Sequence, residues 1–339
     1  MVGSRILGWL NARLQQIFNN RQPFGGIPIL LFGDLRQLGP VGDRYIFQAE
    51  KCNPYGHLIG NPLWELFRCF ELTEIMRQKD DAAFARALNN LAEGTLRDED
   101  IKLLKSRETN TENVPKDALR LFQRNADVDR FNESVICTKK DVHLVKSEDR
   151  AQGQGSRKLA EKALQTVESL KLKDTAGLPT TLKLALNIKY MITVNISVPD
   201  GLVNGAIGIL KEIEKMQAEG EPVRLWLSFE DTKVETRTIR PLQFPVTPAE
   251  AITIYKSQGG TYSKVSVYLS QGLKRNDIYV AFSRCTALSG LYIIGNFQPP
   301  LPPDPFDELF NFFPRTLITI YSVAVALFFL MRVPSTYAV

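Results

Sequence analysis

An apolar segment at residues 251–255 leads into a loop whose residue types could bind a phosphate. The sequence AITIYKSQGGTYS continues from a β-branched run into Lys256, Ser257, Gln258 and two glycines. A lysine, a hydroxyl group and the exposed backbone N–H of a glycine such as Gly259 form a suitable cradle for a phosphate oxygen. The sequence contains neither GxxxxGK[ST] nor a Gly-Lys pair, so this loop is no Walker A motif. The pattern predicts contact with a nucleic-acid backbone phosphate, and the alternative is a hairpin turn with a solvated lysine.

A second loop follows the continuous apolar run at residues 27–32, which is typical of a strand covered on both faces. Ligands of open α/β sheets bind beyond the C-terminal ends of such strands. Gly33 allows the chain to turn there, Asp34 can fix the turn, and the amide of Gln37 suits the positioning of a terminal phosphate. The alternative is that Asp34 caps a helix and Gln37 is a solvated loop residue.

Two arginines occupy positions from which a guanidinium group could reach a phosphoryl group. Arg77 lies in LTEIMRQ after an apolar strand end, and Arg284 lies in YVAFSRCTALSGLYI at the end of a short helical pattern. Guanidinium groups stabilise the charge that develops on a transferred γ-phosphoryl group. The alternatives are a surface ion pair for Arg77 and relief of the helix dipole for Arg284.

The apolar patterns indicate alternating helices and strands that would position these loops. An amphipathic helix is expected over residues 5–18, and a second helix should begin at Asp80 or Asp81 and stop at Gly94. Short β segments punctuated by Gly and Pro occupy residues 178–240 and predict a small barrel-like subdomain. The chain then returns to strand, loop, strand, helix and strand, so the fold class is α/β.

Composition excludes several kinds of site. The chain has 339 residues and a formal net charge of +5, which is compatible with nucleic-acid binding without requiring it. Its four cysteines form no CxxC pair, which argues against a disulfide framework or a zinc ribbon. Because there are only two histidines, far apart in the sequence, we expect neither a metal cluster nor a Ser-His-Asp triad.

The C-terminal region contains an uncharged apolar stretch at residues 316–331, flanked by Arg315 and Arg332. A helix of this length spans about 24 Å, whereas the hydrocarbon core of a bilayer is about 30 Å thick. A buried or aggregation-prone tail is therefore favoured over a membrane anchor, which stays the alternative.

Five segments in a fixed order carry a family resemblance: FGDLRQLGPV, LTEIMRQ, LVNGAIGIL, AITIYKSQGGT and YVAFSRCTALSGLYI. Over residues 1–297 the chain resembles the petite-integration-frequency (Pif) family of superfamily 1 DNA helicases, including those of Helitron transposons. The resemblance implies two RecA-like domains that clamp ATP and Mg²⁺ and step 5′ to 3′ along single-stranded DNA. It also implies DNA junctions as partners and a nuclear location, with the mitochondrion as the alternative.

The resemblance also assigns roles to individual residues. Gln37 would sense the γ-phosphate, and Arg77 and Arg284 would stabilise the phosphoryl transition state. The nucleotide-binding set implied by the family is Gly33, Asp34, Gln37, Arg77, Gly259 and Arg284. The DNA-binding set implied by the family is Thr253, Lys256, Ser257 and Gln258.

The same resemblance predicts an incomplete first RecA-like domain followed by a complete second one that contains an inserted small β-barrel. The expected segments are the first-domain part at 1–70, the second domain at 71–177 with a polar insertion, the β-rich insertion at 178–245, the remainder of the second domain at 246–298, a Pro-rich linker at 299–315 and the hydrophobic tail at 316–331.

Two departures from the family affect the expected activity. Walker A and Walker B are absent from the sequence, so we expect no meaningful ATP hydrolysis by this N-terminally truncated chain alone. The alternatives are a non-catalytic nucleic-acid-binding remnant of a transposon helicase and a membrane-tethered interaction module. Missing central strands should also leave the helix at 5–18 and the strand at 27–32 with exposed apolar faces and an unpaired edge.

Overall fold

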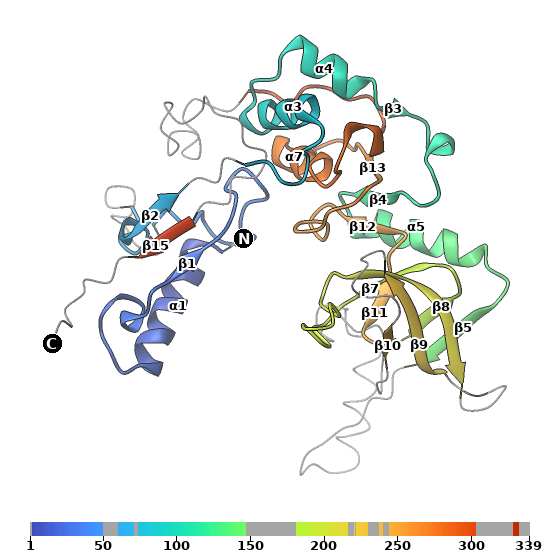
Figure 1. The fold of residues 1–339 in the computed structure, drawn as a ribbon, viewed down its shortest axis with the longest axis horizontal. Coiled ribbons are helices and arrows are strands. Elements are labelled where there is room, and N and C mark those ends of the chain that lie inside the picture. Colours follow the sequence, from blue (N-terminus) through green and yellow to red (C-terminus); the bar gives the residue numbers. More distant parts are fainter. Residues whose placement is uncertain are drawn as a thin grey trace. The chain divides into compact units, whose positions relative to one another are not determined.

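The computed structural model describes residues 2–49, 60–70, 74–146, 181–215, 220, 222–229, 237–239, 244–302 and 328–331. These residues belong to two compact units (Figure 1). The first unit combines Met1–Ala118 with Thr261–Val339, and the second unit is Leu119–Gly260. The predicted polar insertion and most of the predicted Pro-rich linker lie outside the described residues. The six predicted segments are a finer division than these two units, and their bounds stay a prediction.

The N-terminal part of the first unit is a helix packed beside a short sheet. Its elements are α1 (Ser4–Ile17), η1 (Pro23–Gly26), β1 (Leu30–Leu31), η2 (Trp64–Leu66) and β2 (Phe67–Phe70). Its core consists of Leu7, Phe24, Leu35, Ile46, Phe47 and Trp64. Gly25 has φ +66° and lies so close to α1 that a Cβ would meet the carbonyl oxygen of Leu14 at 2.7 Å. Glycine is therefore required where the chain turns back against this helix.

The apolar face of α1 is only partly covered. Leu7 is fully buried, whereas Leu10, Ile17 and Phe18 are 37%, 59% and 51% exposed. This confirms the expectation of exposed apolar surface on the N-terminal helix. The strand predicted over residues 27–32 is shorter, because only Leu30–Leu31 pair as β1.

The C-terminal strand β15 (Phe328–Met331) lies between β1 and β2 and pairs antiparallel with both. One side of β1 is thus paired. Among the described residues β1 is the outer strand on its other side, and the expectation of an unpaired edge applies only there. Of the predicted hydrophobic tail, only these four residues are described, and they form a strand. No helix among the described residues is long and apolar enough to cross a membrane.

The remainder of the first unit surrounds a parallel sheet, with β14 paired to β13 and to β3. Its elements are α3 (Ala82–Glu93), α4 (Asp98–Lys105), β3 (Glu108–Thr109), η3 (Thr111–Asn113), β13 (Val265–Tyr268), α7 (Arg275–Phe282), η5 (Leu288–Gly290) and β14 (Leu291–Ile294). The predicted signals of α3 are confirmed, since Asp81 caps it by accepting from the Phe84 N–H (3.0 Å) and Gly94 ends it in the left-handed conformation. α3 lies beside α7 (Figure 1).

The second unit joins a parallel strand pair to an antiparallel sheet. Its elements are β4 (Leu119–Phe122), α5 (Asn125–Cys137), β5 (Val142–Lys146), β6 (Thr181–Ala185), β7 (Lys189–Ile192), β8 (Ile207–Lys215), β9 (Pro222–Phe229), β10 (Arg237–Ile239), β11 (Val246–Pro248) and β12 (Ala251–Thr253). β12 pairs parallel with β4, β5 pairs with β6, and the five-stranded sheet has the order β10-β9-β8-β7-β11. Strands β7 to β10 of this sheet lie within residues 178–245, the predicted β-rich insertion, whereas β11 lies just beyond that range. Parallel strands with flanking helices confirm the α/β class.

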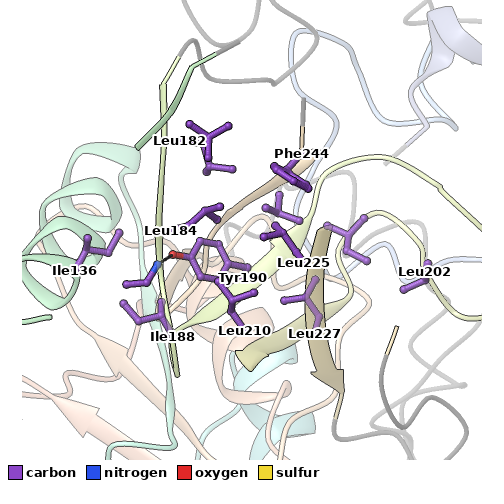
Figure 2. Close-up of a cluster of buried hydrophobic side chains, with 14 residues drawn as sticks. Ile136, Leu182, Leu184, Ile188, Tyr190, Leu202, Leu210, Leu225, Leu227 and Phe244 are labelled. Carbon is purple, nitrogen blue, oxygen red and sulfur yellow. Dashed lines mark hydrogen bonds between the residues drawn. The ribbon is translucent and has the colours of Figure 1, made fainter. Parts of the chain in front are cut away.

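A single apolar cluster forms the core of the antiparallel part (Figure 2). Leu225 and Leu227 alternate along β9 and are fully buried, as expected for a strand with one covered face. Tyr190 is also fully buried, and its hydroxyl donates to the carbonyl of Lys183 and accepts from the N–H of Ala185, both at 2.9 Å.

Candidate functional site

The two predicted phosphoryl-binding arginines meet at one residue in the first unit. Arg77 donates from Nε to Thr261 Oγ1 at 2.9 Å and from Nη1 to the carbonyl of Ser283 at 3.1 Å. Arg284 donates from Nε to the carbonyl of Val280 and from Nη2 to Ser283 Oγ, both at 3.0 Å. Ser283 is thus contacted by both guanidinium groups.

The hydrogen-bond partners of these arginines bear on the two alternatives left open by the sequence, a surface ion pair for Arg77 and relief of the helix dipole for Arg284. Among the described residues, Arg77 donates hydrogen bonds to a hydroxyl and to a carbonyl. It forms no ion pair with an acidic residue there. Arg284 lies two residues beyond the end of α7 and donates to a carbonyl of its last turn, as relief of the helix dipole requires. Because that bond uses only Nε, it does not exclude a second role for the guanidinium group.

Burial disfavours the charged form of both arginine side chains. Arg284 is 1% exposed. Burial, followed by the positive charge of Arg77, lowers the pKa of Arg284 to about 10. Burial also lowers the pKa of Arg77. Both side chains stay protonated at neutral pH, and two partly desolvated cations in one place favour an anion of high charge.

The loop that contains Asp34 and Gln37 is fastened to α7. Asp34 is buried, and its Oδ2 accepts from the hydroxyl of Tyr279 at 3.0 Å and from Gln37 Nε2 at 3.4 Å. The carbonyl of Gln37 accepts from Asn276 Nδ2 at 3.2 Å. Asp34 is therefore no helix cap but the acceptor that holds the loop, and Gln37 is half-buried beside it.

The same loop is fastened to α3 through Arg36, to which the sequence analysis assigned no role. Its Nε lies 3.4 Å from Asp34 Oδ1, and its Nη1 donates to Asn89 Oδ1 at 3.0 Å and to Glu93 Oε1 at 3.3 Å. The arginine side chain is 10% exposed, so the pairs are sheltered from solvent. The only signal in the sequence was an arginine two residues after an aspartate.

Gly33, which was predicted to allow the chain to turn, lies in an unstrained and open position. It has no positive φ, and a Cβ at this position would meet no atom within 4 Å. Neither backbone conformation nor packing therefore requires a glycine here.

The predicted DNA-binding loop lies in the second unit and forms a helical turn after β12 instead of a hairpin turn. The Ser257 N–H donates to the carbonyl of Thr253 at 3.1 Å, and Thr253 Oγ1 accepts from the Lys256 N–H at 3.2 Å. Ser257 is fully buried and donates from Oγ to the carbonyl of Ile254 at 2.7 Å. The hydroxyls of Thr253 and Ser257 thus fix the turn.

The remaining residues of this turn face outward to different extents. Lys256 is exposed and Gln258 is half-buried. Gly259 adopts φ +89°, which any other residue would adopt only with strain. The turn therefore presents a lysine at the end of a buried strand, and its contact with DNA stays a prediction.

A metal centre has no counterpart in the described part of the chain, where no group of three or more His, Cys, Asp or Glu side chains could hold a metal ion.

Comparisons with known proteins find similarity to PIF1 helicases. The family model described as PIF1-like helicase matches residues 1–102. The ATP-dependent DNA helicase PIF1 of Xenopus laevis is 26% identical over 315 residues, which cover 88% of this chain and 46% of the relative. The chain thus spans less than half the length of this relative.

Solved structures show the same fold. The Pif1 helicase of Candida albicans superposes with a TM-score of 0.68 at 23% identity, covering 92% of this chain and 74% of that chain. A Bacteroides Pif1 helicase in complex with ADP-AlF3 and single-stranded DNA superposes with a TM-score of 0.61 at 22% identity, covering 92% and 72%. At such identities the likeness supports the RecA-like fold alone.

Proposed function

We propose that this chain, whose residues 1–102 match the model of PIF1-like helicases, is a member of that family and supplies the phosphate-sensing arginines and the strand-gripping loop of an ATP-dependent DNA helicase that moves 5′ to 3′. The observation that carries this proposal is the meeting of Arg77 and Arg284 at Ser283. A buried arginine and a half-buried arginine beside each other gain from a multiply charged anion such as the γ-phosphate of ATP. The complex of the Bacteroides relative with ADP-AlF3 and single-stranded DNA supports both ligands.

In this mechanism the chain's own residues stabilise charge instead of forming covalent bonds. The Nη atoms of Arg77 and Arg284 would donate to the equatorial oxygens of the transferred phosphoryl group as negative charge spreads over them. Gln37, which Asp34 and Asn276 hold in place, would report the presence of that group to the loop. Bound ATP with Mg²⁺ would supply the phosphoryl group and additional positive charge.

We further propose that the 339 residues alone do not hydrolyse ATP. The sequence lacks GxxxxGK[ST], whose backbone and lysine cradle the β- and γ-phosphates. The expected result for the purified chain with Mg²⁺, ATP and single-stranded DNA is phosphate release no faster than without protein. Robust turnover that disappears in Arg284→Ala would overturn this claim.

The strand-gripping loop can be tested independently of ATP. Lys256→Ala should weaken binding of single-stranded DNA of any sequence and reduce the slope of log K against log salt by about one unit, because one phosphate contact is lost. The measurement is fluorescence anisotropy over a salt titration. Lys211→Ala, an exposed lysine of β8 in the same unit, is the matched control for charge. Equal effects of the two variants would remove Lys256 from the site.

A second candidate is a non-catalytic nucleic-acid-binding remnant of a transposon helicase, favoured by the absence of the Walker A pattern. The two candidates differ in linkage between ligands. A helicase component should bind DNA with an affinity that saturating ADP-AlF3 changes, because Arg77 and Arg284 would still bind the phosphate analogue weakly without Walker A. A remnant should bind DNA equally with and without it. Anisotropy at fixed salt with and without ADP-AlF3 distinguishes them.

A further inference from the structure

The side chain of Gln78 spans the main chain on both sides of Arg284. Its Nε2 donates to the carbonyl of Ser283 at 3.2 Å and to the carbonyl of Cys285 at 2.6 Å. The side chain is 1% exposed. Because a reversed amide would place its oxygen against two carbonyl oxygens, the nitrogen must face them.

The cost of burying this amide shows what it contributes. Gln78 Oε1 is buried and has no hydrogen-bond partner among the described residues. A buried acceptor without a donor destabilises the fold, a cost that an apolar side chain of the same size would avoid. The contribution of Gln78 therefore lies in its two donated hydrogen bonds.

The segment that Gln78 holds lies just beyond the end of α7. Its N–H groups still donate to carbonyls of the last helical turn, whereas its own carbonyls need partners from outside the helix. α7 ends at Phe282, and Arg284 follows in the turn beyond it. The carbonyl of Arg284 itself accepts from the Tyr262 N–H at 3.0 Å, and the Thr286 N–H donates back to Tyr262 at 3.2 Å. Three successive carbonyls, those of residues 283 to 285, are thus held alternately by Gln78, Tyr262 and Gln78.

We propose that Gln78 is a positioning residue that clamps the main chain around Arg284 and so fixes where its guanidinium group lies. The proposal rests on the function proposed for Arg284 above. Arg77, its neighbour in sequence, would contact the phosphate directly and also donates to Ser283. Gln78 acts only through the main chain on either side of Arg284. Of these two neighbouring residues, Arg77 would therefore bind the ligand and Gln78 would hold Arg284 in position.

The test replaces the amide and follows Arg284 itself. Gln78→Met keeps similar length without donors, and Gln78→Glu places a carboxylate against two carbonyl oxygens. Labelling with phenylglyoxal, mapped by mass spectrometry, reports access to each guanidinium group. We expect Arg284 to be protected in the native chain and labelled at least tenfold faster in both variants, with Glu above Met. Arg130, whose side chain is 80% exposed, is the internal reference.

Hydrogen exchange separates a local clamp from a general loss of stability. The Tyr262 and Thr286 amides should lose protection at least tenfold in Gln78→Met, whereas amides of α3 should not. Asn132 is a matched control, since its Nδ2 donates to the carbonyls of Pro248 and Ala251 in the second unit. Asn132→Leu should leave the labelling of Arg284 unchanged.

The outcomes are distinct from those of the proposed function, because neither readout needs ATP or DNA. If Arg284 stays protected in both Gln78→Met and Gln78→Glu, Gln78 only fills space and the proposal is wrong. If Gln78→Met unfolds the first unit, Gln78→Asn retains an amide with shorter reach. Intermediate labelling of Arg284 in that variant supports the clamp, and labelling equal to the native chain overturns it.

Discussion

Single residues of this chain often serve the fold where their type suggested chemistry. Ser257 and Thr253 have the hydroxyls of a ligand-binding loop, yet both hydroxyls bond to the turn that contains them. Gln78 was part of a recognised segment without a role, yet it holds the main chain on both sides of a buried arginine. The type of a residue indicates which bonds it can make, and only its burial and partners show which ones it makes.

Tyr190 makes the stability of the second unit depend on pH. Its pKa is raised from 10.0 to about 12, chiefly by burial. Between these values the unfolded chain has lost the phenol proton and the folded chain keeps it, so stability falls as pH rises. The contribution is complete below about pH 10, and about 1.4 kcal/mol is lost per pH unit above it.

Urea unfolding of the native chain and of Tyr190→Phe between pH 8 and 11 measures this dependence. At pH 8 the variant should be less stable by roughly 1–3 kcal/mol, because Ala185 N–H and the Lys183 carbonyl lose their partner. The difference between the two proteins should shrink above pH 10. A constant difference would show that the phenol proton is not linked to folding.

At the scale of elements, the loop at residues 34–37 is fastened to α7 by one buried hydrogen bond to a carboxylate. The Tyr279 hydroxyl, 1% exposed, donates to Asp34, and burial raises its pKa above the usual value, so it stays a donor. Tyr279→Phe should cost about 1.5–3 kcal/mol. Hydrogen exchange should show the loop and Gln37 loosened while the N-terminal half of α1 is unaffected.

Tyr292→Phe is the matched control for this prediction, because its ring alone packs against Arg107. We expect its free energy of unfolding to change by less than about 0.5 kcal/mol. If the two variants lose the same stability, or if Tyr279→Phe leaves the loop protected, α7 does not hold this loop through Asp34.

Elements whose signals are local were predictable from the sequence, and contacts between distant segments were not. α3 was bounded correctly because its N-cap at Asp81 and its stop at Gly94 lie next to it in the chain. The position of Arg284 after a short helix was also local. By contrast, the bond between Asp34 and Tyr279 joins residues 245 positions apart, and no period or motif specifies such a pair. β1 was predicted too long, because an apolar run does not reveal how many of its residues find a partner.

At the scale of the whole molecule, the C-terminal strand has a place in the sheet of the first unit. β15 pairs Leu330 with Leu30 on one side and with Arg68 on the other, so it satisfies the facing edges of β1 and β2. Removing it would expose two strand edges beside the apolar surface of α1. Exposed strand edges and apolar surface both promote aggregation. The strand β15 is therefore expected to increase the solubility of the chain, whereas a membrane anchor would decrease it.

Deletion of residues 316–339 should therefore lower the soluble fraction of the chain in detergent-free buffer. Deletion of residues 332–339 retains β15 and should have little effect. Phe329→Pro removes a ladder N–H without changing length and should act in the same direction as the long deletion, since proline cannot donate within a strand paired on both sides. A gain in solubility on deleting 316–339 would contradict this prediction. It would show that the segment binds membranes or aggregates, and that the sheet of β1 and β2 does not need β15.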